Sequence, residues 1–123
     1  MSNEFAIRKI RASDWAFIIS SYVRSSRKHY RIKESIFYSH FPILAERRVT
    51  ECEVLVAVGL EDDSHILGYI VYSGDVCHWV YTKQILRGHG VAKALLKHAE
   101  GDGKFTQTTA PCPTFLHFNP FLT

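Results

Sequence analysis

The chain has 123 residues, of which 46% are hydrophobic and 22% are charged, and its net charge is +3. This is the length of one domain, and the composition is that of a globular protein rather than a disordered or fibrous one. We therefore predict a single domain over residues 1–123. Apolar runs are far shorter than the roughly 20 residues that span a bilayer, and the N-terminus does not resemble a signal peptide. We expect a cytoplasmic protein with no membrane partner.

Cysteines and histidines show no metal-binding pattern. The three cysteines, Cys52, Cys77 and Cys112, lie far apart, which fits neither a disulfide framework nor a zinc knuckle. The seven histidines form no HExxH motif and no His–Cys spacing of a metal site. The sequence therefore predicts reduced thiols and no bound metal.

A cluster of basic residues lies between Arg24 and Lys33. It could bind an anionic partner such as a nucleic acid or the phosphates of a cofactor. It could equally be a solvated loop, and we favour this interpretation because no nucleic-acid fold signature accompanies it. Nucleic acid is thus an unlikely partner.

The first half of the chain predicts a strand and two helical segments. Residues 5–10 alternate apolar and polar side chains, as a strand does. Apolar residues at helical spacing follow Ser13, a candidate N-cap, and predict a helix from about Asp14 to Arg24. After a loop over residues 25–33, Pro42 is expected to open a fresh helical turn that continues to Arg48.

The second half predicts an antiparallel meander, then a helix. A β-branched run over 54–58 predicts a buried strand, and two further strands are predicted at 66–72 and 76–81, joined by short connections rich in turn residues. Apolar residues at helical spacing follow from Val91, and Gly101 is a natural helix stop. Residues 104–109 are expected to form one further strand, and the prolines beyond forbid long regular structure.

The loop before the last helix has the chemistry of a phosphate site. In Arg87-Gly88-His89-Gly90 the glycines let backbone N–H groups approach a ligand. The first N–H groups of the following helix have no internal partner and favour an anion. The loop lacks the GxxxxGK[ST] pattern of a P-loop. Lys93 stands where a dinucleotide fingerprint needs a small residue.

The segment Arg87-Gly88-His89-Gly90-Val91-Ala92 resembles the signature of the GNAT superfamily of acyl-CoA N-acyltransferases. That signature is Arg or Gln, two residues, Gly, one residue, and Gly or Ala. The preceding strands resemble the family's third and fourth strands, and the resemblance covers about residues 5–109. It implies an α/β (α+β) fold with a mixed, mainly antiparallel sheet flanked by helices, in a short member truncated at the C-terminus, without the usual C-terminal strands.

The resemblance also implies a cofactor and a site. Acetyl-CoA (coenzyme A) would lie along the fourth strand, with pantetheine contacts from Val80, Tyr81 and Thr82. The pyrophosphate would be held by the signature residues, Arg87, Gly88, His89, Gly90, Val91 and Ala92. Gln84 lies near the position where family members usually carry a proline.

The implied reaction is acetyl transfer to an amine of a small molecule or protein, which needs a base. The family's base often lies on the fourth strand, so His78 or Asp75 is the candidate catalytic residue. No tyrosine occurs from Phe105 to Thr123, where many members place the acid, and Cys112 or Thr114 would have to replace it. The alternative function is therefore an acyl-CoA-binding module without turnover that acts by binding another protein.

Five large apolar side chains follow in the tail: Phe115, Leu116, Phe118, Phe121 and Leu122. Burying each is worth roughly 1.5–3 kcal/mol. We expect them to cover the protein's own sheet, to form a homodimer or to dock on a protein partner. The strand at 104–109 is expected to be an open sheet edge.

Overall fold

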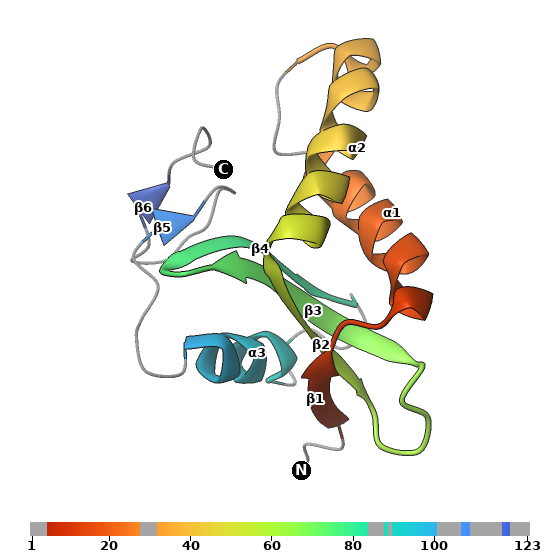
Figure 1. Ribbon diagram of the computed structural model, residues 1–123, viewed down its shortest axis with the longest axis vertical. Helices are drawn as coiled ribbons and strands as arrows, with labels where there is room; N and C mark the ends of the chain where they lie inside the picture. The colour runs from red at the N-terminus through yellow and green to blue at the C-terminus, as the bar shows by residue number, and fades with distance from the viewer. Residues whose placement is uncertain are drawn as a thin grey trace.

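The computed structural model describes residues 5–27, 32–83, 88 and 90–100, together with the backbone at 107–108 and 117–118. Its central feature is a sheet with helices on both faces (Figure 1). The strands lie in the order β1-β2-β3-β4-β5-β6. The first four pair antiparallel, and the β4–β5 and β5–β6 pairs are parallel. The predicted mixed, mainly antiparallel sheet is confirmed.

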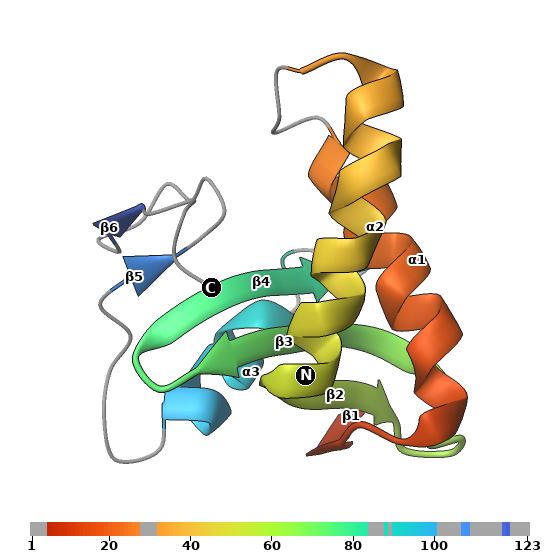
Figure 2. The same ribbon diagram turned by 45° about the horizontal axis from the view of Figure 1, so that its top comes forward.

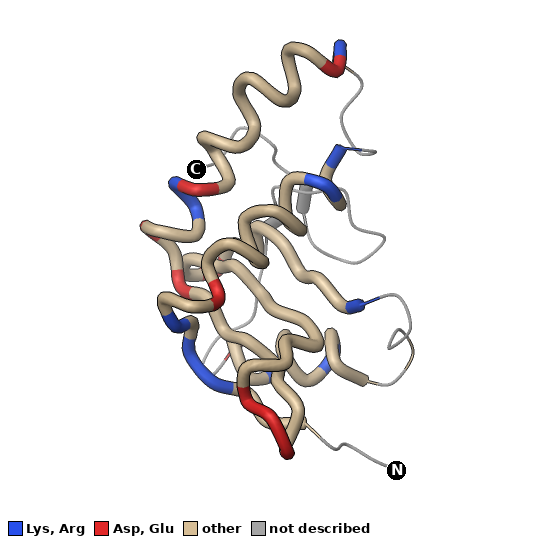
Figure 3. The backbone as a smooth tube through the Cα atoms, turned by 90° about the vertical axis from the view of Figure 1, so that its right-hand side faces the viewer, with Lys and Arg blue, Asp and Glu red and all other residues tan. Residues whose placement is uncertain are grey.

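The antiparallel part of the sheet follows the predicted strands closely. The strands are β1 (Phe5–Lys9), β2 (Glu53–Gly59), β3 (Ile66–Ser73) and β4 (Val76–Thr82). Within β2, β3 and β4, Glu53 at the first position of β2 is the one Lys, Arg, Asp or Glu, and the others of this region lie in the two connections. Figure 3 shows the charged residues of this region gathered at the ends of the elements. The strands can therefore be buried on both faces.

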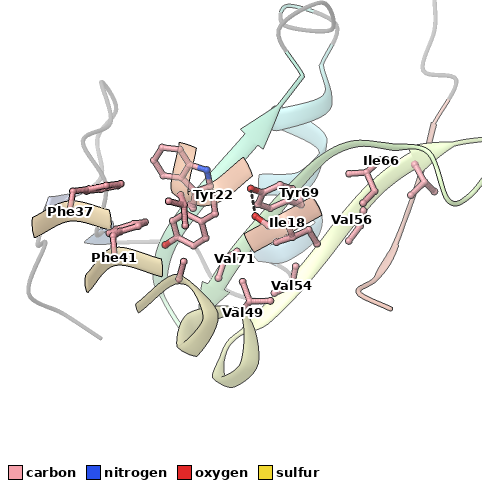
Figure 4. Packing of buried hydrophobic residues seen from close by; sticks show 14 residues of the cluster. Ile18, Tyr22, Phe37, Phe41, Val49, Val54, Val56, Ile66, Tyr69 and Val71 are labelled. Carbon is pink, nitrogen blue, oxygen red and sulfur yellow. Dashed lines mark hydrogen bonds between the residues drawn. The ribbon is translucent and has the colours of Figure 1, made fainter. Parts of the chain in front are cut away.

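Helices α1 (Trp15–Ser26) and α2 (Glu34–Glu51) cover one face of this sheet. Their apolar side chains pack with those of β2, β3 and β4 in the larger core cluster. Figure 4 shows the aromatic part of this cluster, where Tyr22 lies beside Phe41 and Phe37 stacks on Phe41. Helix α3 (Val91–Glu100) covers the other face, where Val91 and Leu95 pack against residues of β2, β3 and β4. No helix within the described ranges is long and apolar enough to cross a membrane.

Two helix predictions were wrong in detail. Ser13 does not cap α1, because a 3-10 turn, η1 (Ala12–Asp14), precedes the helix and places Asp14 at the N-cap position. Pro42 does not open a new helix but lies inside the continuous α2. An interior proline removes one helical hydrogen bond and crowds the carbonyl four residues earlier, but the face that buries Phe37, Phe41 and Ala45 continues across it. Figure 2 shows α2 as one long helix that extends beyond the sheet.

The C-terminal strands are very short. Strand β5 is Gln107–Thr108 and pairs with Val76 and Cys77 of β4. Strand β6 is His117–Phe118 and pairs with β5 on its other side. The expectation that the strand near 104–109 is an open edge is therefore wrong at these residues. Cys112, Thr114 and the other tail positions named above lie outside the described residues, apart from the backbone at 117–118.

Candidate functional site

On its outer edge, strand β4 pairs with another described strand only at its first residues. In the described residues β5 pairs with Val76 and Cys77, and no strand pairs with β4 beyond them on that side. The inner edge stays bonded to β3, with pairs from Gly68–Thr82 to Ser73–Val76. The outer-edge N–H and C=O groups of Val80, Tyr81 and Thr82 therefore have no strand partner among the described residues, and groups of this kind can bond to an extended ligand. These three residues are the predicted pantetheine contacts, and all are half-buried.

Helix α3 begins close in sequence to this segment of β4. The amide of Ala94 donates to the carbonyl of Gly90 at 3.0 Å, so Gly90 occupies the N-cap position. The N–H groups of Val91, Ala92 and Lys93 therefore come before the first helical bond. They carry the positive end of the helix dipole, which is the local requirement for holding a phosphate.

Gly88 and Gly90 adopt backbone angles that disfavour other residues, with φ values of 88° and 86°. A Cβ at either position would meet no atom of the described residues within 4 Å. Conformation rather than crowding by these residues therefore explains the glycines, and the described residues leave room for a ligand beside them. These observations fit a bound pyrophosphate. Arg87 and His89, the other two loop residues predicted to contact it, lie outside the described residues, as does Gln84.

Gly68 of β3 fixes how closely α3 and β4 approach each other. A Cβ there would lie 2.5 Å from the carbonyl oxygen of Tyr81 and 3.0 Å from Cγ1 of Val91. Both neighbours belong to the predicted cofactor site. From the sequence, Gly68 was predicted only as part of the strand at 66–72. An isolated glycine within a strand pattern was the available signal for a close backbone approach.

His78 lies at an irregularity in β4. Val71 pairs with Trp79 and Tyr72 pairs with Cys77, so His78 is the extra residue of a β-bulge. Its side chain is 1% exposed. Burial, together with the charge of Arg48, lowers the pKa of His78 to about 4. The imidazole is therefore neutral at pH 7 and can accept a proton, although a low pKa weakens it as a base.

Asp75, the other candidate base, lies in a different environment. It occupies the turn between β3 and β4, beside Gly74 with its φ of 58°, and is exposed. His78 and Asp75 thus differ in access to water. Among the described residues, no three His, Cys, Asp or Glu side chains gather closely enough to hold a metal ion.

Arg48 and Tyr22 are buried polar residues next to β4 that the sequence analysis did not connect with the site. Nη1 of Arg48 donates to the hydroxyl of Tyr22 at 3.1 Å. The ring of Tyr22 stacks on Trp79, with centroids 5.5 Å apart and planes 8° apart. The available signal was helical spacing, since Arg48 lies on the same face of α2 as the buried Phe41 and Ala45.

A second polar cluster lies at the start of the chain and stabilises the fold. Nη1 and Nη2 of Arg8 donate to the two carboxylate oxygens of Asp14 at 2.7 and 3.1 Å, and the amide of Arg11 donates to the same group at 2.7 Å. Burial opposes ionisation of Asp14, but these bonds and charges outweigh it and lower its pKa. The cluster joins β1 to the entry of α1.

Comparison with known proteins identifies the fold. No protein-family model matches the sequence, and no curated protein is significantly similar to it. Solved structures do match. PaiA N-acetyltransferase from Thermoplasma acidophilum, in complex with coenzyme A, is 20% identical with a TM-score of 0.59, over 83% of this chain and 72% of that one.

Two further structures agree. A GNAT family acetyltransferase from Brucella melitensis, in complex with acetyl-CoA, is 21% identical with a TM-score of 0.55, over 81% of this chain and 68% of that one. YjaB from Escherichia coli, in its apo form, is 20% identical with a TM-score of 0.62, over 80% and 66%. Across such structures the chain spans 64% to 74% of the neighbour's length. The predicted resemblance is confirmed at the level of fold: the chain has the GNAT fold.

Proposed function

We propose that this protein binds acetyl-CoA along β4 and at the N-terminus of α3, and that it transfers the acetyl group to an amine. The observation that carries the proposal is the outer edge of β4 at Val80–Thr82, which has no strand partner among the described residues and lies close in sequence to an α3 N-terminus with φ-positive glycines. These two features suit the two halves of the cofactor, an extended pantetheine arm and a charged pyrophosphate. Neighbours with coenzyme A and acetyl-CoA bound support the assignment.

Two different parts of the chain would bind the pantetheine arm and the pyrophosphate of the cofactor. Backbone groups of Val80, Tyr81 and Thr82 would bond to the pantetheine arm. The loop Arg87–Ala92 would hold the pyrophosphate through N–H groups and the charge of Arg87. Bound acetyl-CoA supplies an acetyl thioester, from which the acetyl carbon passes to the amine nitrogen as the C–N bond forms and the C–S bond breaks.

Proton transfer accompanies this exchange. The amine loses a proton, and the departing sulfur must gain one to become the coenzyme A thiol. His78, neutral at pH 7, is the proposed acceptor of the amine proton, with Asp75 as the alternative. Since the pKa of His78 is lowered to about 4, protonation of His78 should reduce the rate only as pH falls towards 4. The ordinary histidine range near 6.5 is therefore not where protonation of this residue should remove activity.

Gly90→Asp tests the site directly. The substitution puts a negative charge and a side chain at the α3 N-terminus, so we expect calorimetric titration to show loss of coenzyme A binding with the fold retained. Gly74→Asp is the matched control, because Gly74 also has positive φ, and a Cβ there also meets no atom within 4 Å. Unchanged affinity in Gly90→Asp would remove the cofactor assignment.

Turnover requires a separate measurement. Release of the coenzyme A thiol with a panel of amines and peptides should occur in the parent protein and fall about a hundredfold or more in His78→Ala, with coenzyme A affinity retained. Parental rates in His78→Ala would shift the base to Asp75 or water. Cofactor binding without transfer to any amine would favour the alternative function, a binding module that acts on another protein.

A further inference from the structure

Arg48 is a buried cation in the middle of a helix packed against the sheet. Its residue is 4% exposed, and it lies on α2 next to Val49, which is 2% exposed. An arginine at such a depth is retained at a cost, because a charge withdrawn from water needs a partner of opposite charge. The group that pairs with the charge of Arg48 therefore bears on what the site binds.

The described residues do not provide an anionic partner. The hydroxyl of Tyr22 accepts one bond from Nη1 of Arg48 at 3.1 Å, and the buried Nε has no hydrogen-bond partner. The ion pairs within the described part of the chain involve other arginines, Arg8, Arg11 and Arg47. A guanidinium offers five N–H groups in a planar fork, and a single neutral hydroxyl leaves most of that capacity unused.

Arg48 also lies beside the part of β4 where the proposed reaction takes place. The ring of Tyr22, to which Arg48 bonds, stacks on Trp79 of β4. The charge of Arg48 is close enough to His78 to lower the pKa of the imidazole. His78 and Trp79 are the first residues of β4 beyond its pairing with β5. A ligand that bonds to Arg48 would thus be held next to the candidate base.

We propose that Arg48 binds a carboxylate of the substrate, and that the acetyl acceptor is therefore an amine that also carries a carboxylate, as an amino acid does. The planar fork of arginine matches the two oxygens of a carboxylate, and such bonds are stronger where water is excluded. Among the described residues, the neutral Tyr22 hydroxyl at Nη1 does not compensate the charge of Arg48, and a bound carboxylate would do so. This inference rests on the proposed function, because it names the acceptor class of the same site.

The test compares Arg48→Met with Arg47→Met. Methionine keeps much of the volume of arginine without its charge, and Arg47 is an exposed neighbour on α2 that pairs with Glu51. Binding of the L-amino acids and of their amides to the coenzyme A-loaded protein is measured by calorimetry. We expect at least one amino acid to bind the parent tenfold to a hundredfold more tightly than its amide. Arg48→Met should lose this preference, and Arg47→Met should keep it.

Thermal melting separates a binding role from a structural one. If the function of Arg48 is to bind a substrate carboxylate, Arg48→Met removes a buried charge that the ligand-free protein does not need. The melting temperature of the ligand-free variant should then be unchanged or higher. A melting temperature several degrees lower in Arg48→Met, with ligand preference unchanged, would make Arg48 structural and overturn the proposal. Equal affinity of the parent for the amino acids and their amides would overturn it too.

The carboxylate could also belong to the acyl group. Succinyl-CoA is therefore compared with acetyl-CoA, and an Arg48-dependent preference for succinyl-CoA without any preference among acceptors would refute the acceptor assignment. The parent's failure to bind coenzyme A would refute the proposed function instead. Amino acids and amides can then be titrated without cofactor, so that the carboxylate preference of Arg48 is still measured.

Discussion

Protonation of His78 should make the protein lose stability in mild acid. His78 is 1% exposed, and burial together with the charge of Arg48 lowers its pKa to about 4. In the unfolded chain the pKa is near the ordinary value of about 6.5. The folded state therefore binds fewer protons than the unfolded state between these values. Stability from this residue is fully present above about pH 6.5 and is lost as pH falls towards 4.

The size of the loss follows from the two pKa values. A shift of about 2.5 units corresponds to about 3.4 kcal/mol once both states are protonated. Between pH 7 and pH 4.5, a range in which unfolding is measurable, the expected loss is about 2.5 kcal/mol. This is a large part of the stability of a small domain, which is typically about 5–15 kcal/mol.

Urea unfolding at several pH values measures this loss in the parent, in His78→Gln and in a control, His40→Gln. His40 is exposed on α2, so its substitution should leave the pH dependence intact. The parent and control should lose about 2.5 kcal/mol more than His78→Gln between pH 7 and 4.5. Equal losses in all three proteins would refute the inference that buried, neutral His78 controls acid stability.

Three further predictions concern packing and the ends of the chain. Gly68→Ala should cost about 1–3 kcal/mol of stability and weaken coenzyme A binding, because its Cβ would lie 2.5 Å from the Tyr81 carbonyl oxygen. Gly59→Ala, whose nearest contact would be an ordinary 3.5 Å, should do neither in the same denaturation and titration measurements. Asp14→Asn should cost about 3 kcal/mol at pH 7 in urea unfolding, since it breaks a buried pair with Arg8. That cost should shrink in acid as Asp14 of the parent becomes protonated, and a pH-independent difference would contradict the assigned charge. Deleting residues 113–123 removes β6 from the sheet, so the melting temperature should fall or the mass in light scattering should change; identical values would show that the tail is dispensable.

Local patterns in the sequence were enough to predict most of the helices and strands. The spacing of apolar residues in strands and helices depends on neighbours along the chain. The ends of β2, β3, β4 and α3 were therefore predicted within a residue or two. Glycine at positions 88 and 90 predicted a backbone that a ligand can approach closely, and the structure adds that both residues have positive φ. The prediction failed at Pro42, because buried residues both before and after it in α2 favour a continuous helix over the local tendency of proline to begin one.

Tertiary structure alone decided the electrostatics of the site. The sequence contains His78 and Arg48 thirty residues apart, and only the packing of α2 on the sheet buries both and brings the cation close enough to lower the pKa of the imidazole. It likewise places Gly68 against Tyr81 and, among the described residues, leaves Val80–Thr82 without a strand partner on the outer edge of β4. Burial and charge proximity depend on contacts between distant segments, which periodicity along the chain does not encode.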